Sequence, residues 1–340
     1  LVLTGPPGSA RTSLLNVLRK TTFRPAQRHS IELPERLTSE AAFARQVVQG
    51  LGLSLDPGPD LTLDAVAEHL REQPVPDRLR VCTIEHLEHV VQRTVGGMQL
   101  AARVLGFLSE TDTRVLWVAT TTNAAWQLVE ASEPAAARLV TRHSLEPLTR
   151  PELEELILRR HQRSGLRLVF DAPDESTHPI LARRVRALED EDRRQALLRS
   201  EFFDHLYEAS GQNVMLALFY WFRSVTLADD DTTLRVRPLE PIAFGGLDAL
   251  PLPHAFALKA LLEHGTLTVG ELAEVLGVPA DTSRSLLETL GNALLIAPAG
   301  EGEGATAFQF ASVDHDTRYR IRPLLIHPVT RFLRSRNIVH

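Results

Sequence analysis

The sequence contains a single cysteine, Cys82, and only two lysines among its 37 basic residues, Lys20 and Lys259. One cysteine excludes an internal disulfide, and because Cys82 lies in an apolar run we expect a buried thiol in a reducing compartment. The 13 histidines show no metal-ligand spacing, so no zinc site is predicted. No serine lies in a nucleophile-elbow motif, which leaves a hydrolase triad without support.

Long apolar runs are also lacking. No stretch of 18 or more apolar residues occurs, and no signal peptide is recognisable, so we expect no membrane span and a cytoplasmic protein. The chain opens with Leu-Val-Leu-Thr, which is typical of the middle of a fold, so we expect preceding residues to be missing. The net charge of −6 argues against a general polyanion partner. The preference for arginine, with abundant alanine and leucine, is typical of a GC-rich bacterial genome.

Three segments are predicted from the patterns that are present. Residues 1–148 alternate short apolar runs with helical patterns, which predicts a parallel α/β sheet covered by helices. Residues 149–245 are expected to form a helical lid, helical throughout as far as 225, and residues 246–340 a winged-helix domain. The strands are predicted at 1–4, 29–33, 79–84, 114–119 and 143–145, and the helices of the first segment at 12–20, 40–51, 63–71, 98–108 and 126–131.

The winged-helix prediction is based on three helices, at 255–264, 268–276 and 280–290, with a tight turn at Gly277. The second helix begins with a Thr-x-x-Glu box formed by Thr268 and Glu271. A hairpin of 294–297 with 308–311 follows, separated by a glycine-rich loop at 300–304. A strand-like run at 319–322 and a last helix at 329–334 complete the segment.

A glycine-rich turn links the first strand to the first helix. Its residues are Gly5, Pro6, Pro7, Gly8, Ser9, Ala10, Arg11 and Thr12, followed by Ser13. Backbone amides at such a turn and helix N-terminus bind phosphate, and the usual pattern is G-x-x-x-x-G-K-[ST]. Ala10 replaces the second glycine and Arg11 the lysine, which favours retained binding of ATP or ADP with impaired hydrolysis. The alternative is a glycine-rich turn that binds nothing.

Together with the run 79–85, this loop resembles that of AAA+ P-loop ATPases, and the order of segments is similar to the origin-recognition and STAND-type clades. The resemblance implies that Glu85 stands at the magnesium-binding Asp position and His86 at the position of the water-polarising Glu. Mg²⁺ would then lie between Thr12 and Glu85. Alternatively, Glu85 and His86 begin an exposed helix.

The resemblance implies further site residues. Thr121 and Asn123 occupy the place of the sensor that contacts the γ-phosphate; they can equally be a strand terminus and a helix cap. Met215 stands where the lid arginine of the family belongs. Arg138 or Arg142 would supply an arginine finger in trans to a homo-oligomer, or they are surface charges.

The predicted third helix of the winged-helix segment offers Arg284 beside Asp281 and Glu288, and residues 251–340 hold eight Lys or Arg against nine Asp or Glu. Nucleic-acid binding is therefore not favoured. The C-terminal arginines, 318 to 336, form a nucleic-acid edge, a partner-docking edge or a solvated face. We expect a nucleotide-binding regulatory ATPase or pseudo-ATPase that acts as a conformational or assembly switch and binds protein partners through its lid or winged helix. The alternatives are an initiator-type ATPase that binds DNA and a protein-interaction scaffold without nucleotide.

Overall fold

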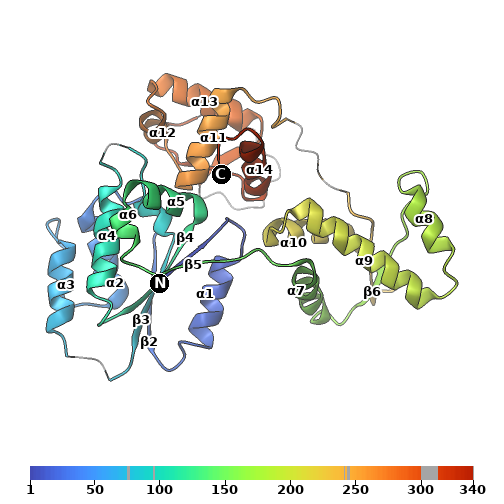
Figure 1. Ribbon diagram of the computed structural model, residues 1–340, viewed down its shortest axis with the longest axis horizontal. Coiled ribbons are helices and arrows are strands. Elements are labelled where there is room, and N and C mark those ends of the chain that lie inside the picture. The colour runs from blue at the N-terminus through green and yellow to red at the C-terminus, as the bar shows by residue number, and fades with distance from the viewer. Residues whose placement is uncertain (75–76, 95, 241, 243–245, 300–312, 340) are drawn as a thin grey trace. The chain divides into compact units, whose positions relative to one another are not determined.

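A computed structural model describes residues 1–74, 77–94, 96–240, 242, 246–299 and 313–339 (Figure 1). The chain divides into two compact units. The first unit combines Leu1–Leu145 with Gly246–His340, and the second is Glu146–Gly245. The division into three domains remains a prediction; in the structure, its first and third segments together form one compact unit.

The N-terminal segment of the first unit contains a five-stranded sheet in the order β2-β3-β4-β1-β5, and all neighbouring strands are parallel. Its strands are β1 (Val2–Gly5), β2 (Gln27–Glu32), β3 (Arg80–Glu85), β4 (Leu116–Thr122) and β5 (Arg142–Ser144). The five predicted strands are confirmed, with ends displaced by up to three residues. The central strands β1, β3 and β4 are almost wholly buried, which explains their continuous apolar runs.

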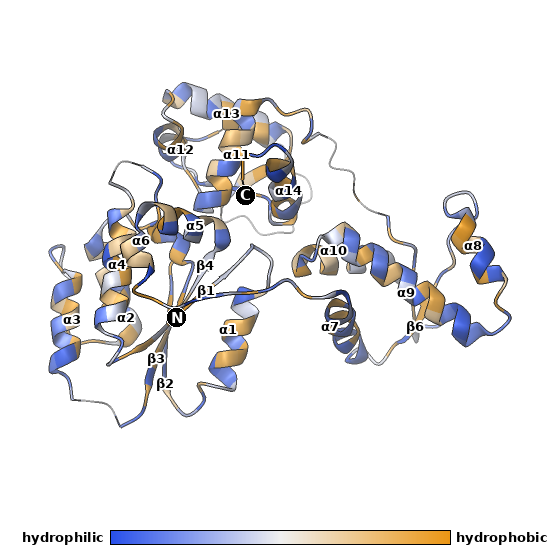
Figure 2. Cartoon of the chain, viewed as in Figure 1, coloured by the Kyte–Doolittle hydropathy of each residue, from blue (hydrophilic) through white to orange (hydrophobic). Residues whose placement is uncertain are grey.

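Helices cover both faces of this sheet (Figure 1). On one face α1 (Arg11–Lys20) packs Leu15 against Leu3, Val81 and Val118. The other face is covered by α2 (Glu40–Leu51), α3 (Leu63–Glu72), α4 (Gln99–Glu110), α5 (Asn123–Ser132) and α6 (Pro134–Ala137), with the 3-10 turn η1 (Leu87–Val90). Figure 2 shows that these helices carry hydrophobic residues on one side and hydrophilic residues on the other. Cys82 is fully buried, as predicted.

The C-terminal segment of the first unit has the predicted winged-helix elements. These are α11 (Leu252–His264), α12 (Val269–Leu276), α13 (Ala280–Asn292), β9 (Ile296–Pro298), β10 (Tyr319–Ile321), the 3-10 turn η2 (Pro323–Leu325) and α14 (Ile326–Ser335). The Thr268–Glu271 capping box is confirmed. Strand β9 pairs antiparallel with β10. The run predicted as its partner, 308–311, lies outside the described residues, as does the loop 300–304.

The second unit is not helical throughout. It contains α7 (Arg150–Gln162), α8 (Pro179–Arg186), α9 (Glu191–Ser210) and α10 (Val214–Ser224), and also β6 (Arg167–Phe170), β7 (Val225–Leu227) and β8 (Thr233–Val236). The three strands form a sheet in the order β6-β8-β7. The prediction missed β6 because a strand of four residues is defined by its long-range pairing with β8, which no local pattern reveals. An aromatic core of Phe170, Phe202, Phe203 and Trp221 holds helices and sheet together.

Candidate functional site

The loop between β1 and α1 is a tight turn. The Ser9 amide donates to the Pro6 carbonyl at 3.1 Å, and Gly8 between them has φ +82°, as expected for a type II turn with Pro7 in its second position. The turn folds back so closely over the end of β1 that a Cβ on Gly5 would lie 2.6 Å from the Ser9 Oγ. Gly8 is therefore required by the backbone of this turn, whereas at Gly5 the close neighbour is the movable side-chain hydroxyl of Ser9.

Ala10 has a left-handed backbone, with φ 63° and ψ 26°, at the N-cap of α1. This is the position at which the usual pattern has glycine, and a left-handed alanine costs about 1–2 kcal/mol. Ala10 has no side-chain oxygen with which to cap the helix, so the first-turn amides of α1 have neither an intrahelical acceptor nor a side-chain cap there. Thr12 and Ser13 of this turn are exposed. The helix N-terminus is thus available to an anion.

Arg11, at the position of the usual lysine, lies beside an acid that the sequence did not indicate. Its Nη2 is 3.9 Å from the Glu88 Oε1, and the two side chains are 13% and 5% exposed. Glu88 is also 3.4 Å from the His86 Nδ1. Burial by itself would raise the pKa of Glu88, but the hydrogen bond from His86 and the charge of Arg11 outweigh it and hold that pKa at about 2. The same hydrogen bond raises the pKa of His86. Glu88 is therefore an ionised carboxylate that competes for the cation of the phosphate loop.

Glu85 is the last residue of β3 and His86 follows it, and neither begins an α-helix. Glu85 accepts a hydrogen bond from the Arg19 Nη2 of α1 at 3.0 Å, and its side chain is 12% exposed. Arg19 also binds the Thr83 hydroxyl, 2.9 Å from its Nε. His86 has a left-handed backbone with φ 63° and precedes η1. Glu85 is thus already paired, through one carboxylate oxygen, with a cation of the chain itself.

The end of β4 lies beside the phosphate loop, because Thr121 pairs with Thr4 and Thr122 with Gly5. Thr121 is buried. The helix cap of α5 is Thr122, whose hydroxyl accepts from the Ala125 amide at 3.1 Å. Asn123 is therefore the first residue of α5, and its buried Oδ1 has no hydrogen-bond partner in the described residues. This arrangement leaves the side-chain oxygen of Asn123, a hydrogen-bond acceptor, available to a ligand.

Orphaned polar atoms test whether a nucleotide fits this end of the sheet. The Ser9 Oγ, the Glu88 Oε2 and the Asn123 Oδ1 are all buried and lack hydrogen-bond partners within the part of the chain that the structure describes. Buried polar groups are rarely left without partners, and the Ser9 hydroxyl can donate to a phosphate oxygen, whereas the Glu88 and Asn123 oxygens are acceptors that need a donor. A phosphate would be held by the loop amides, Ser9 and Arg11. Among the described residues no group of three or more metal-ligating side chains occurs, so any Mg²⁺ would depend on phosphate and water for most of its ligands.

The remaining predicted site residues are not gathered here by any contact. Arg142 pairs with Glu130 at 3.1 Å and its Nε donates to the Thr4 hydroxyl, so a role in trans would require it to leave both partners. Arg138 is exposed after α6. Met215 is half-buried in the first turn of α10 in the second unit. Their proposed roles stay predictions.

Sequence reasoning missed Glu88, Arg19 and the capping role of Thr122. Glu88 carries no motif signal, because its approach to Arg11 depends on the turn that His86 and η1 make after β3. Arg19 lies two helical turns beyond Thr12 on α1, and this spacing was available in the sequence. Thr122 stands between the two residues that were proposed, and the order Thr-Asn at a strand end leaves the cap ambiguous by one position.

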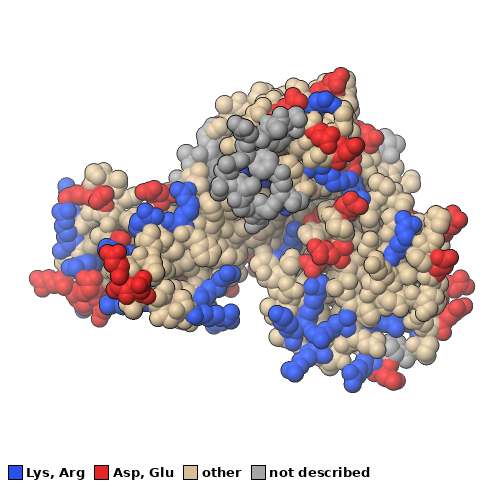
Figure 3. Space-filling view, turned by 180° about the vertical axis from the view of Figure 1, so that it is seen from behind, with Lys and Arg blue, Asp and Glu red and all other residues tan. Residues whose placement is uncertain are grey.

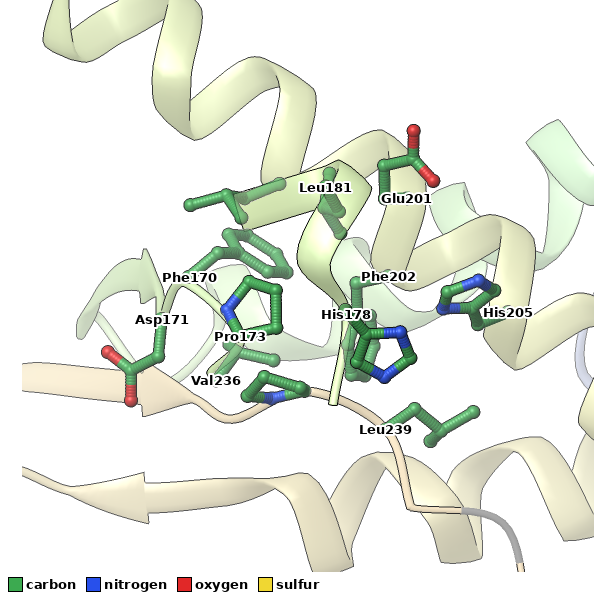
Figure 4. Close-up of a pocket in the computed structure, with 12 residues that line it drawn as sticks. Phe170, Asp171, Pro173, His178, Leu181, Glu201, Phe202, His205, Val236 and Leu239 are labelled. Carbon is green, nitrogen blue, oxygen red and sulfur yellow. The ribbon is translucent and has the colours of Figure 1, made fainter. Parts of the chain in front are cut away.

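The second unit contains a separate small pocket (Figure 4). Its floor is apolar and includes Phe170 and Phe202, while His178 and His205 lie side by side with ring centroids 6.0 Å apart. The two lining carboxylates are already paired, Asp171 with Arg235 and Glu201 with Arg184. The pocket lacks a phosphate loop, so we place the candidate site in the first unit.

Comparisons with known proteins gave only distant matches. No protein-family model and no curated protein matches the sequence. Among solved structures, the chain is similar to the Aeropyrum pernix ORC2 protein in ADPNP–ADP complexes, with 15% identity, 98% of this chain and 87% of that chain covered, and a TM-score of 0.44. It is similar to Cdc6p from Pyrobaculum aerophilum, with 15% identity, 98% and 87% covered, and a TM-score of 0.39. It is also similar to Drosophila ORC bound to DNA, with 12% identity, 100% and 90% covered, and a TM-score of 0.41.

Identities of 12–15% and TM-scores below 0.5 describe a distant likeness. The strand order β2-β3-β4-β1-β5, with the glycine-rich turn after β1, establishes the P-loop α/β fold from the chain itself. No described helix is long and apolar enough to cross a membrane.

Proposed function

We propose that this chain is an AAA+-like nucleotide-binding switch that binds ATP or ADP at the phosphate loop and hydrolyses ATP weakly or not at all. The observation that carries the proposal is the loop itself. It combines an uncapped helix N-terminus, a cation at Arg11 and a buried hydroxyl, Ser9 Oγ, without a partner. Amides and a helix dipole of this kind bind phosphate oxygens irrespective of whether the bound nucleotide reacts.

Weak hydrolysis is supported by two features of the site. Glu85 is engaged by Arg19, so a metal ion gains no uncommitted carboxylate there. His86 stands where the family has its water-polarising Glu, and its Nδ1 is directed to Glu88. The hydrogen bond to Glu88 occupies one ring nitrogen of His86, and the raised pKa favours the protonated ring. A protonated histidine is a poor base for the attacking water.

We expect the switch to act on protein partners rather than on DNA. On the face shown in Figure 3, acidic and basic side chains are mixed over the part formed by the C-terminal segment. Helix α13, the recognition helix of a DNA-binding winged helix, carries Asp281 and Glu288 beside Arg284. DNA binding would therefore have to use the arginines after Asp316, and steep salt dependence of binding would identify it.

The proposal is tested by thermal unfolding with ATP and ADP, each with and without Mg²⁺. A nucleotide present at one hundred times its dissociation constant adds about 2.7 kcal/mol to the free energy of unfolding. Arg11→Met should lose most of this stabilisation. The control Arg71→Met, which removes an exposed ion pair between Arg71 of α3 and Glu110, should keep it. No stabilisation of the parent by either nucleotide would leave the protein-scaffold alternative in its place.

Turnover is measured separately as phosphate release. We expect the parent to release little phosphate, and the double variant Ala10→Gly/Arg11→Lys, which restores the usual loop, to release more. If the parent hydrolyses ATP readily and Glu85→Gln abolishes this, the loss of hydrolysis is wrong and an active ATPase is the better description.

A further inference from the structure

One buried arginine contacts both segments of the first unit. Arg36, in the loop between β2 and α2, has a side chain that is 0% exposed. Its Nη1 donates to the Val91 carbonyl at 3.0 Å, and its Nη2 donates to the carbonyls of His264 at 3.0 Å and Thr266 at 3.2 Å. Glu271 of α12 lies 3.8 Å from its Nε. A single buried guanidinium therefore joins the end of η1 to the end of α11.

A histidine at the same junction is fixed in one protonation state. The His264 Nδ1 lies 2.8 Å from the Ala260 carbonyl and must donate to it, so its Nε2 accepts from the Arg93 amide at 2.9 Å. Burial, and then the charge of Arg36, lower the pKa of His264 to about 4. Gly265 follows with φ +75°, which a side chain would strain, and this conformation sends two carbonyls toward Arg36. Arg93 also pairs with Glu263 at 3.4 Å.

The core residues that contact Arg36 and His264 come directly after Glu88 in the sequence, and Glu88 is the acid that pairs with Arg11 of the phosphate loop. Glu88 pairs with Arg11 from within η1, and the segment after it supplies the Val91 carbonyl and the Arg93 amide. The next residue of η1, His89, is anchored to the Leu33 carbonyl at 2.7 Å. Elements η1 and α11 are in direct contact. Six residues of chain thus link the cation of the phosphate loop to the docking of the C-terminal segment.

We propose that phosphate binding at Arg11 and docking of the C-terminal segment 246–340 on the core oppose each other through η1. The proposal rests on nucleotide binding at the loop and names how that site is regulated. In the docked state Glu88 is buried against Arg11. A phosphate that takes Arg11 leaves the carboxylate buried with His86 alone, which is unfavourable. Movement of η1 toward solvent relieves this and withdraws Val91 and Arg93 from Arg36 and His264.

Thermodynamic linkage requires that docking and nucleotide binding affect each other equally. If nucleotide weakens docking, docking must weaken nucleotide binding by the same factor, and such couplings are typically about 5- to 150-fold. A variant that loosens the junction should therefore bind nucleotide more tightly although it changes no residue of the phosphate loop.

The test compares nucleotide affinity and amide exchange in the full chain. Arg36→Met keeps an apolar stem but removes all three carbonyl contacts, and Arg93→Ala is a milder variant because that side chain is 49% exposed. The control is Arg103→Met, which removes an exposed arginine of α4 that pairs with Glu40 and Asp64. We expect ATP or ADP to bind at least 5-fold more tightly to Arg36→Met, less so to Arg93→Ala, and unchanged to Arg103→Met. Nucleotide should speed exchange across residues 87–94 in the parent.

Glu88→Gln isolates the link. It removes the negative charge that pairs with Arg11, so nucleotide binding should become tighter. The nucleotide affinity of this variant should not change further when Arg36→Met is added. If the parent binds nucleotide but its affinity is the same, within twofold, in both junction variants, or if bound nucleotide leaves exchange across 87–94 unchanged, the coupling is wrong. If neither the parent nor the junction variants bind nucleotide, while Arg36→Met still speeds exchange, the proposed nucleotide site fails and the coupling fails with it. Should Arg36→Met not fold, Arg93→Ala decides both outcomes.

Discussion

Replacement of Ala10 by glycine should stabilise the first unit. Ala10 has φ 63° and ψ 26°, where an L-residue with a Cβ costs about 1–2 kcal/mol. Glycine removes this cost but adds about 0.5–1 kcal/mol of backbone entropy to the unfolded chain. The difference spans about 0–1.5 kcal/mol, with a central gain of about 0.8 kcal/mol. For a unit of this size, with a shift of about 2–4 °C per kcal/mol, the melting temperature should rise by about 1–4 °C.

Thermal and urea unfolding, followed by circular dichroism, measure this change. The matched control is Ala102→Gly in α4, where the backbone is helical and glycine should destabilise by about 1 kcal/mol. Ala10→Gly should also bind nucleotide more tightly, since the Cβ no longer separates phosphate from the backbone. A loss of stability equal to that of the control would refute the strained conformation of the phosphate loop.

Three further predictions concern other parts of the first unit. Burial raises the pKa of Cys82 to about 12, so the folded protein should react with a thiol reagent at pH 8 only at the rate at which it unfolds. Because the pKa of His264 is lowered to about 4, the unfolded chain takes up its proton first as the pH falls. Stability should then be complete above about pH 6.5 and decline toward pH 4 by an amount on the order of 3 kcal/mol, and His264→Gln should flatten this part of the pH profile. Thr122→Ala should cost about 1 kcal/mol in urea unfolding through loss of the α5 cap, while Thr122→Ser should keep it.

The core sheet was predictable because its signals are local. Each strand is a short apolar run between helical patterns, and buried parallel strands need no other information. The capping box at Thr268 with Glu271 was recognisable from four residues. Element ends were less accurate: the strand expected at 114–119 extends to Thr122, which caps α5.

The features that sequence reasoning missed depend on contacts between distant residues. Arg36 lies in a polar loop, and no local pattern indicates that α11, more than 200 positions later, will bury it; its hydrogen bond to the His264 carbonyl spans 228 positions. Glu88 is one acid among 43, and only the left-handed backbone of His86 turns it toward Arg11. The loop residues were predicted from their motif, but the pairing of Arg11 with Glu88 could not be.

Calorimetric titration of the full chain with ATP and with ADP tests nucleotide binding at the phosphate loop most directly. We predict a saturable, single-site heat for at least one nucleotide in the parent, weakened at least tenfold in Arg11→Met and unchanged in Arg71→Met. Absence of saturable binding in the parent, or binding that Arg11→Met leaves intact, would contradict the assignment of the site.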